Sequence, residues 1–240
     1  MRIDKNCWLL NKPIAHRGLW NDKIVENSLS AYKNAIDNGY PIEIDVYQTA
    51  DGEIVSFHDK CLLRMTGAQG MVYEKTITQL KDLSLLNTNE KIPTLKEVLS
   101  LIDGKVPLLI EFKEQPKKNF IENTVNILKN YKGEFAVQSF NPLYLNKIKK
   151  LAPEFIRGIL ATESHGKEKN MVVRFILKHM PLNFLCKPDF ISYSHTGLPL
   201  KNRKIKNRPV IAWTVTSKKV YDKIKPFCQN IIFENFIPEK

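Results

Sequence analysis

Short apolar runs alternate with stretches of helical spacing along most of the chain. Each run is four to seven residues long and ends in polar or charged side chains, a pattern typical of buried strands. Between the runs, apolar residues recur every three or four positions, which predicts amphipathic helices. The eight predicted strands are Pro13–His16, Ile42–Tyr47, Val106–Phe112, Phe135–Ser139, Phe155–Leu160, Phe190–Tyr193, Val210–Val215 and Asn230–Phe233. The predicted helices are Ser28–Gly39, Thr94–Ile102, Phe120–Tyr131, Pro142–Leu151, Glu168–Met180 and Ser217–Phe227.

This order of elements predicts the fold class. Strands that alternate with helices favour a parallel sheet. Eight such strands in 240 residues favour an α/β fold of the TIM (β/α)₈ barrel type. A doubly wound open sheet is the alternative, but it usually has fewer strands and a glycine-rich phosphate turn, and no G-x-G-x-x-G or Walker sequence occurs here. We therefore expect one barrel domain over residues 1–240.

One segment departs from this alternation. Asp51-Gly52 lies between two strand-like stretches, which is a strong signal for a β-hairpin. A two-residue turn there would place Asp45 opposite His58, and Glu43 would share the face of Asp45 because side chains alternate along a strand. The stretch that follows, approximately residues 59–91, has its own apolar residues. We expect it to pack on the barrel as a small insertion.

Composition narrows the class of protein. Hydrophobic residues make up 43% and charged residues 26% of the chain, which excludes a largely disordered protein. No apolar run approaches the ~18 residues of a membrane span. The four cysteines form no Cys-x-x-Cys pair, which predicts buried free thiols, and residues 1–12 lack the pattern of a secretory signal. We therefore expect a cytoplasmic protein. The cysteines are Cys7, Cys61, Cys186 and Cys228.

The net charge of +12 suggests an anionic partner: nucleic acid, a phospholipid surface or a phosphorylated small molecule. Nucleic acid is not expected, because the sequence has no recognised binding motif and its basic residues are not arranged with stacking aromatics. Lys201–Arg208 has five basic residues and no acid, which indicates a solvated surface or transient contact with an anionic membrane surface. Leu182–Cys186 would add apolar contacts with lipid if it is exposed.

Chemically active side chains gather at the ends of the first three predicted strands and of the hairpin. The carboxyl ends of barrel strands meet at one mouth. Three carboxylates there would repel one another unless a cation joins them, which indicates a hard divalent metal ion. An arginine and a lysine suit a phosphate, and two histidines with pKa values near ~6.5 suit proton transfer. The set predicts metal-assisted phosphodiester cleavage. Its members are His16, Arg17, Glu43, Asp45, His58, Glu111 and Lys113.

The order of these motifs along the chain is specific. His-Arg is followed by Glu-x-Asp, His-Asp and Glu-x-Lys, and the whole series resembles the glycerophosphodiester phosphodiesterase family of PLC-like phosphodiesterases. Two later motifs, Gln138-Ser139-Phe140 and Trp213-Thr214-Val215, resemble the Q-S-F and W-T-V of that family. The motifs of the main series are His16-Arg17, Glu43-Ile44-Asp45, His58-Asp59 and Glu111-Phe112-Lys113.

The resemblance implies a TIM barrel that hydrolyses glycerophosphodiesters to sn-glycerol 3-phosphate and an alcohol. It implies that a neighbouring hydroxyl of the substrate attacks phosphorus to form a cyclic phosphate, which water then opens. Phe140 and Trp213 are candidates for the walls of the glycerol site, with core packing as the alternative. By resemblance, the acid/base pair is His16 and His58, the ligands of Mg²⁺ or Ca²⁺ are Glu43, Asp45 and Glu111, and the phosphate contacts are Arg17 and Lys113.

The chain also departs from the family pattern. Thr216 stands where the family usually has Asn, and Glu234-Asn235 stands in place of a Thr-Asp pattern. These departures leave the preferred alcohol or head group open. Two alternatives remain: a lysophospholipase D-like enzyme that uses the same residues with a more apolar pocket, and a barrel that binds phosphate compounds without turnover. The intact set of histidines and carboxylates argues against the second.

Overall fold

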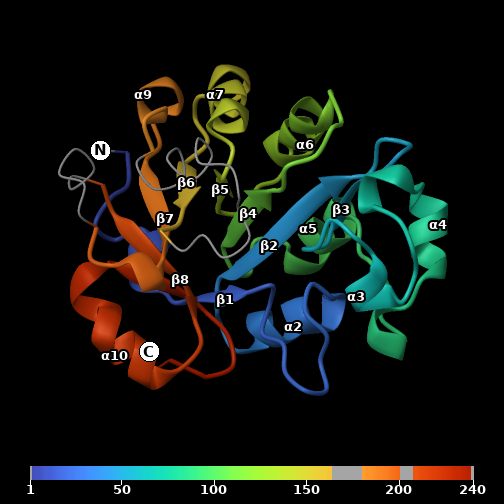
Figure 1. Ribbon diagram of the computed structural model, residues 1–240, viewed down its shortest axis with the longest axis horizontal. Coiled ribbons are helices and arrows are strands. Elements are labelled where there is room, and N and C mark those ends of the chain that lie inside the picture. The colour runs from blue at the N-terminus through green and yellow to red at the C-terminus, as the bar shows by residue number, and fades with distance from the viewer. Residues whose placement is uncertain (1, 164–179, 201–207, 239–240) are drawn as a thin grey trace. The chain divides into compact units, whose positions relative to one another are not determined.

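A computed structural model describes residues 2–163, 180–200 and 208–238 of the chain. The chain divides into two compact units, each with its own share of the strands and helices (Figure 1). One unit is Arg17–Phe135. The other combines Met1–His16 with Ala136–Lys240.

In the unit Arg17–Phe135, strand β2 (Ile42–Gln48) lies between two neighbours. It pairs in parallel with β4 (Leu108–Phe112) and antiparallel with β3 (Ile54–Ser56). All seven residues of β2 and all five of β4 are buried, as expected for parallel strands that are covered on both faces. The helices of this unit outside the insertion are α2 (Leu29–Asp37), α5 (Leu95–Ile102) and α6 (Phe120–Lys129).

Helix starts in this unit follow local chemistry that the sequence predicts. The Ser28 hydroxyl accepts a bond from the backbone N–H of Ala31 (3.1 Å) and so caps α2. Thr94 and Glu97 form a reciprocal capping box at the start of α5. Each cap satisfies backbone donors that the first turn of a helix leaves without partners.

The hairpin is present, but its predicted register is wrong by one residue. Val46 pairs with Ser56 and Tyr47 with Val55, so Asp45 lies opposite Phe57 instead of His58. The loop has three residues rather than two, with Gly52 in the left-handed region (φ 96°). The longer loop lets the Asp51 carboxylate accept bonds from the backbone N–H of Ile77, at the start of α4 (Ile77–Asp82).

The inserted stretch forms a small apolar core of its own against the hairpin. It contains α3 (Leu63–Thr66), α4 and two 3₁₀ turns, Val72–Glu74 and Leu85–Asn87. In Figure 1, α4 lies to the right of β3. Side chains from the insertion pack on the outward side chains of β2 and β3. The buried members are Val25, Tyr47, Val55, Phe57, Leu62, Met65, Val72, Leu80, Leu85 and Ile92.

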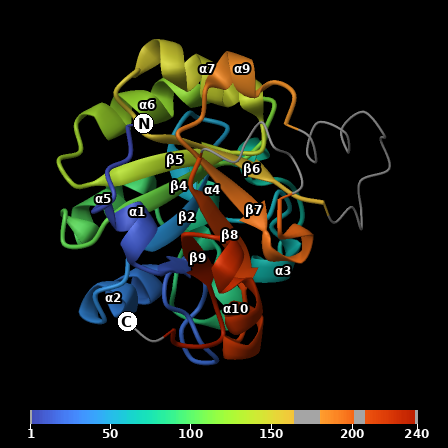
Figure 2. The ribbon, with the colours of Figure 1, turned by 90° about the vertical axis from the view of Figure 1, so that its left-hand side faces the viewer.

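The other unit is a parallel sheet with strands in the order β1, β9, β8, β7, β6, β5. Its helices include a pair, α7 and α9, that lie side by side in both views (Figures 1 and 2). The strands are β1 (Ile14–His16), β5 (Phe135–Ser139), β6 (Arg157–Ala161), β7 (Phe190–Ser194), β8 (Val210–Val215) and β9 (Asn230–Phe233). The α-helices among its described residues are α1 (Trp8–Asn11), α7 (Pro142–Leu151), α9 (Asn183–Cys186) and α10 (Lys218–Ile224).

All eight predicted parallel strands are present, and five of the six predicted helices are found. Residues 168–179 of the sixth lie outside the described residues, as do residues 201–207 of the basic stretch. None of the four cysteines, all of which lie in the described ranges, forms a disulfide. Only Cys186 is buried, and the other three are half-buried, so the expectation of buried thiols is wrong for them. Over the described ranges, no helix has the length and apolar character needed to cross a membrane.

Candidate active site

The register of β2 and β4 gathers the three predicted metal carboxylates. Glu43 and Asp45 are two residues apart on β2 and so project from one face. Asp45 pairs with Glu111 of β4 in the parallel register, which places their side chains next to each other on that face. All three carboxylates are buried, and each offers an oxygen that lies within 4.8 Å of the others. The sequence prediction of one carboxylate cluster is therefore confirmed.

Two cations lie against this cluster. The ammonium group of Lys113, two residues beyond Glu111, is 2.9 Å from Glu111 Oε1 and 3.3 Å from Asp45 Oδ1. The guanidinium of Arg17 lies 3.7 Å from Asp45 Oδ2, and its backbone N–H donates to Glu43 Oε2 (3.1 Å). Burial alone would lower the pKa of Lys113, but Glu111 and Asp45 raise it instead, so the amine stays charged.

The carboxylate cluster fits a hard divalent cation. Burial and the neighbouring charges of Asp45 and Glu111 raise the pKa of Glu43 well above its ordinary value. A divalent ion would relieve this repulsion, and oxygen donors are the ligands that Mg²⁺ and Ca²⁺ prefer. The residues that could hold the ion are Glu43, Asp45 and Glu111.

A tight loop positions Arg17. Arg17 (φ 58°), Gly18 (φ 85°) and Asn27 (φ 52°) all have left-handed backbone conformations, and the N–H of Asn27 donates to the carbonyl of Arg17 (2.9 Å). At Gly18, a β-carbon would lie 2.8 Å from the β-carbon of Ala31 on α2. Only glycine fits this position, because it tolerates the positive φ and lets the loop pack directly on the helix.

A buried hydrogen-bond network holds Asp45 from behind. The side-chain amide of Asn27 donates to Asp45 Oδ2 (3.1 Å). The hydroxyl of Tyr32 donates to Asn27 Oδ1 (2.8 Å) and also bonds with the hydroxyl of Ser56 (2.6 Å). Such outer contacts commonly orient metal-binding carboxylates. The sequence alone assigned no role to Asn27.

His58 is held by its neighbour in the chain. Its Nδ1 lies 2.6 Å from Asp59 Oδ1, and Asp59 also accepts two bonds from Arg64 of α3. Burial alone would raise the pKa of Asp59, but His58 and Arg64 hold it well below its ordinary value, so the carboxylate is ionised at neutral pH. An ionised carboxylate at Nδ1 fixes the orientation of the imidazole ring.

His16, in the other unit, has a corresponding carboxylate from the far end of the chain. Its Nδ1 lies 2.6 Å from Glu234 Oε2, just after β9. Parallel pairing of β1 with β9 places Ala15 beside Phe233, which brings the following residues together. Sequence reasoning noted Glu234 only as a departure from the family pattern and missed this contact. The position directly after the last strand was the available signal.

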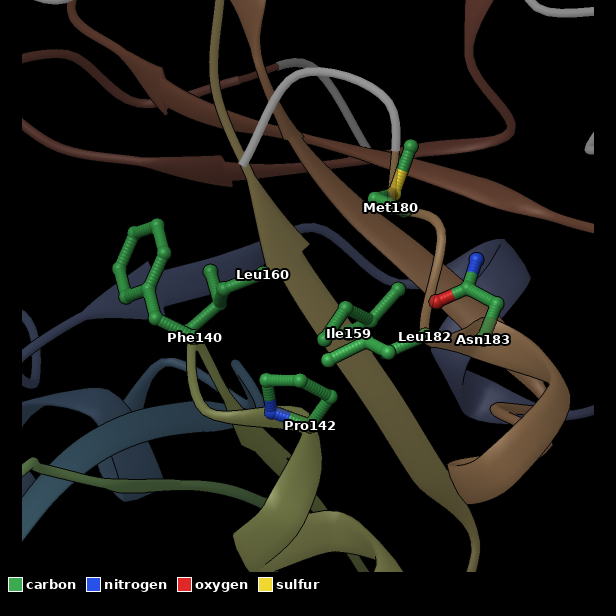
Figure 3. A pocket seen from close by; sticks show the side chains of 7 residues that line it. All are labelled: Phe140, Pro142, Ile159, Leu160, Met180, Leu182 and Asn183. Atoms are coloured by element: carbon green, nitrogen blue, oxygen red, sulfur yellow. The ribbon is translucent and has the colours of Figure 1, made fainter. Parts of the chain in front are cut away.

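The two predicted aromatic wall residues contact each other. The rings of Phe140 and Trp213 meet edge to face, with centroids 5.6 Å apart. Phe140 also lines a small, mainly apolar pocket of about 10 Å³, shown in Figure 3. The other residues that line it are Pro142, Ile159, Leu160, Met180, Leu182 and Asn183.

The predicted site residues outside the carboxylate cluster thus fall into three groups. Arg17 and Lys113 contact the carboxylate cluster directly. His58 lies in the same unit but bonds to Asp59, and the hairpin register that would have placed it opposite Asp45 is wrong. His16, Phe140 and Trp213 belong to the other unit.

Comparisons with known proteins agree on one family over most of the chain. The model of the glycerophosphoryl diester phosphodiesterase family matches residues 16–232. A glycerophosphodiester phosphodiesterase of Caldanaerobacter subterraneus is 35% identical over 159 residues, which cover 61% of this chain and slightly under two thirds (65%) of that protein. YhdW of Bacillus subtilis is 31% identical over 88% of this chain and 89% of its own length.

A solved structure extends this likeness to the fold. The phosphodiesterase of Oleispira antarctica, in complex with its product sn-glycerol 3-phosphate, is 25% identical, with 93% of each chain covered and a TM-score of 0.75. The likeness confirms the predicted fold class, an α/β fold of the TIM type with eight parallel barrel strands and β3 as an extra strand after β2. The chain therefore belongs to the glycerophosphoryl diester phosphodiesterase family and is a phosphoric diester hydrolase.

Proposed function

We propose that this protein hydrolyses glycerophosphodiesters to sn-glycerol 3-phosphate and an alcohol, with a divalent metal ion as cofactor. The observation that carries the proposal is the buried cluster of Glu43, Asp45 and Glu111 with Arg17 and Lys113 against it. Family membership and the product bound to the Oleispira relative support it.

Each cation of the cluster has a role with the phosphate in this proposal. Arg17 and Lys113 contact the phosphate and orient it, and their charges stabilise the negative charge that develops on its oxygens. Glu43, Asp45 and Glu111 hold Mg²⁺ or Ca²⁺, which when bound polarises a phosphoryl oxygen.

His16 and His58 transfer the protons of the reaction. In each histidine a carboxylate oxygen lies 2.6 Å from Nδ1, so we assign proton exchange with the substrate to the other ring nitrogen, Nε2. The nucleophile is a neighbouring hydroxyl of the substrate. One histidine removes its proton, the other protonates the departing alcohol, and the two exchange roles when water opens the cyclic phosphate.

Phe140 and Trp213 are proposed as walls for the glycerol moiety. Their edge-to-face contact gives a rigid apolar surface of the kind that packs against carbon–hydrogen groups. The alternative is that both rings serve only to pack the core, and substrate binding by variants at these two positions would distinguish the two roles.

A lysophospholipase D-like activity is the second candidate, because the pocket lined by Phe140, Leu160 and Met180 is mainly apolar (Figure 3). Its volume of about 10 Å³ lies far below the ~300–1,000 Å³ of typical ligand pockets. The pocket therefore has no room for an acyl chain, and the glycerophosphodiester is the favoured substrate.

Three further properties belong to this proposal. The whole chain acts as one phosphodiesterase domain, with residues 59–91 as its insertion. Cysteines that form no disulfide support a cytoplasmic protein. Transient contact with an anionic membrane surface is supported by the exposed ring of Phe184 on α9, although residues 201–207 of the basic stretch lie outside the described residues.

The test offers glycerophosphocholine, glycerophosphoethanolamine and a lysophospholipid to metal-loaded protein. The readout is release of the phosphomonoester, which is sn-glycerol 3-phosphate from the first two substrates and lysophosphatidate from the third. We expect release from the first two substrates, loss of release with EDTA, and recovery with Mg²⁺ or Ca²⁺. His16→Ala should abolish it. Activity on the lysophospholipid alone would select the second candidate, and activity that EDTA leaves unchanged would contradict the metal assignment.

A further inference from the structure

Arg64 forms hydrogen bonds with two carboxylates that lie far apart in the sequence, Glu26 and Asp59. It lies on α3, in the insertion. Its Nε donates to Asp59 Oδ2 (2.5 Å), and its Nη2 donates both to Asp59 Oδ1 (3.0 Å) and to Glu26 Oε1 (2.6 Å). The fork of one guanidinium therefore binds Asp59 through both of its oxygens and reaches Glu26 at the same time.

Each of these carboxylates holds a proposed functional residue on its other side. Asp59 Oδ1 lies 2.6 Å from Nδ1 of His58. Glu26 Oε1 accepts a bond of 2.8 Å from Nη1 of Arg17. The contacts thus run without interruption from His58 through Asp59, Arg64 and Glu26 to Arg17, and Arg64 is the middle link.

The charges and burial of this chain suit a positioning role. The side chains of Glu26 and Asp59 are 11% and 23% exposed, whereas Arg64 is 48% exposed and reaches them from the surface. Burial opposes the ionisation of Glu26, but the bonds from Arg64 and Arg17 outweigh it and hold its pKa below the ordinary value. Both carboxylates are therefore anionic at neutral pH, and each shares its charge between Arg64 and a functional residue.

We propose that Arg64 is a positioning residue that aligns His58 with Arg17 through Asp59 and Glu26, so that the insertion takes part in orienting the phosphate and the proton donor. This inference rests on the proposed roles of His58 and Arg17. Arg64 acts through its two carboxylates, and its loss would leave each of them with one cationic partner fewer.

Arg64→Met removes the link and keeps most of the aliphatic side chain. We expect kcat/KM for glycerophosphocholine to fall about 10- to 100-fold, because small displacements of catalytic groups have effects of this size. The loss should divide between a lower kcat, through His58, and a higher KM, through Arg17. Arg64→Lys should recover only part of it, since an ammonium group cannot contact both carboxylates in the same fork geometry.

Lys81→Met is the matched control. Lys81 also lies in the insertion and also pairs with a carboxylate outside it, Glu97, at 2.5 Å, but this pair does not contact the proposed site residues. Its kcat and KM should equal those of the unaltered protein. Thermal unfolding should separate a positioning role from a general role in stability. Equal, small changes in Tm in both variants, with a kinetic loss only in Arg64→Met, would support positioning. A kinetic loss of the same size in Lys81→Met would overturn the proposal.

Double-mutant cycles show whether the kinetic effect of Arg64→Met passes through Glu26 and Asp59. They also distinguish this coupling from a loss of activity through misfolding. With Glu26→Gln present, Arg64→Met should raise KM by less than it does alone, and with Asp59→Asn present it should lower kcat by less than it does alone. Additive effects in both cycles would overturn the proposal. Failure of the proposed function is distinguishable, because the unaltered protein would then show no metal-dependent hydrolysis of glycerophosphocholine. Failure of the proposed residue roles would appear as retained activity in His58→Gln and Arg17→Met. If both variants lose activity while Arg64→Met is as active as the unaltered protein, only the present inference fails.

Discussion

His16 and His58 each have a carboxylate oxygen next to Nδ1, but one carboxylate is distant in the sequence and the other is adjacent. His58 bonds to the next residue, Asp59, whereas His16 bonds to Glu234, 218 positions away. Both Nδ1–oxygen distances are 2.6 Å. The pairs differ in their surroundings: Asp59 is tied further to Arg64 of the insertion, and Glu234 follows the last strand of the other unit. The comparison teaches that one geometry can be set by a dipeptide or by the pairing of distant strands.

The largest effect should come from removing either imidazole. We expect His16→Gln and His58→Gln each to lower kcat by about 10²- to 10⁴-fold, the usual range for a general acid or base. Steady-state kinetics with glycerophosphocholine would measure it. A loss confined to one of the two variants would break the comparison, because only one histidine would then transfer protons.

Loss of a metal carboxylate should come next. Glu111→Gln removes one anionic ligand and leaves Lys113 beside an amide, so we expect metal affinity to fall by at least about 10-fold and activity to recover in part at high Mg²⁺ or Ca²⁺. Isothermal titration with each ion would measure it. Unchanged affinity would show that the ion binds elsewhere. His58→Gln serves as the control, since its metal affinity should not change.

The partner carboxylates provide the direct test of the comparison. We expect Asp59→Asn and Glu234→Gln each to reduce kcat by about 10- to 100-fold, because each leaves its histidine without an anion at Nδ1. Glu234→Asp, which shortens the side chain but keeps the charge, should retain more activity than Glu234→Gln. If kcat falls in only one of these two variants, the two carboxylates have different roles despite their equal distances to Nδ1.

A smaller effect should appear in stability at low pH. The folded-state pKa of Glu26 lies below its ordinary value of about 4.3, so its ion pairs stabilise the protein above that pH, and this contribution disappears as pH falls through the ordinary value toward the folded one. Glu26→Gln should therefore lower the free energy of unfolding near neutral pH. It should also make this free energy less dependent on pH between about 6 and 3. Urea unfolding at several pH values measures this. An unchanged pH dependence would contradict it.

The smallest effect concerns the surface of the unit that contains His16. Phe184 is 69% exposed on α9, beside α7. Phe184→Asp should leave hydrolysis of glycerophosphocholine unchanged and reduce sedimentation with vesicles that contain anionic lipid. Leu86→Asp, at a side chain 53% exposed in the insertion, is the control and should bind vesicles like the unaltered protein. Equal binding by all three proteins would remove the proposed membrane contact.

The fold was largely predictable because its signals are local. The buried runs at Ile42 and Val210 are short and bounded by polar residues, and the capping box at Thr94 is a matter of four consecutive positions. The hairpin register was not, because a two-residue turn and a three-residue turn both accommodate Asp51-Gly52. In the three-residue loop Asp51 accepts a hydrogen bond from the backbone N–H of Ile77, 26 residues away, and the local sequence around the turn does not reveal this contact.

The site divides in the same manner. Glu43 and Asp45 share a face through strand alternation, and a parallel neighbour that ends in Glu-x-Lys completes the cluster, so the sequence suffices to predict it. Glu234, Asn27 and Arg64 were not predicted as partners. Their contacts depend on side chains that meet only after strands pair or the insertion packs, and no spacing in the chain reports such meetings.

The close fit of Gly18 against α2 has a consequence for how this chain tolerates change. Any side chain at this position would collide with both the β-carbon and the backbone of Ala31, so the helix or the loop would have to move. Because the preceding residue is Arg17, the displaced loop would take the guanidinium with it. A neutral-looking substitution such as Gly18→Ala would then abolish activity in a screen while leaving every charged residue in place, and drift at this position should be far more restricted than at the open turn of Gly52.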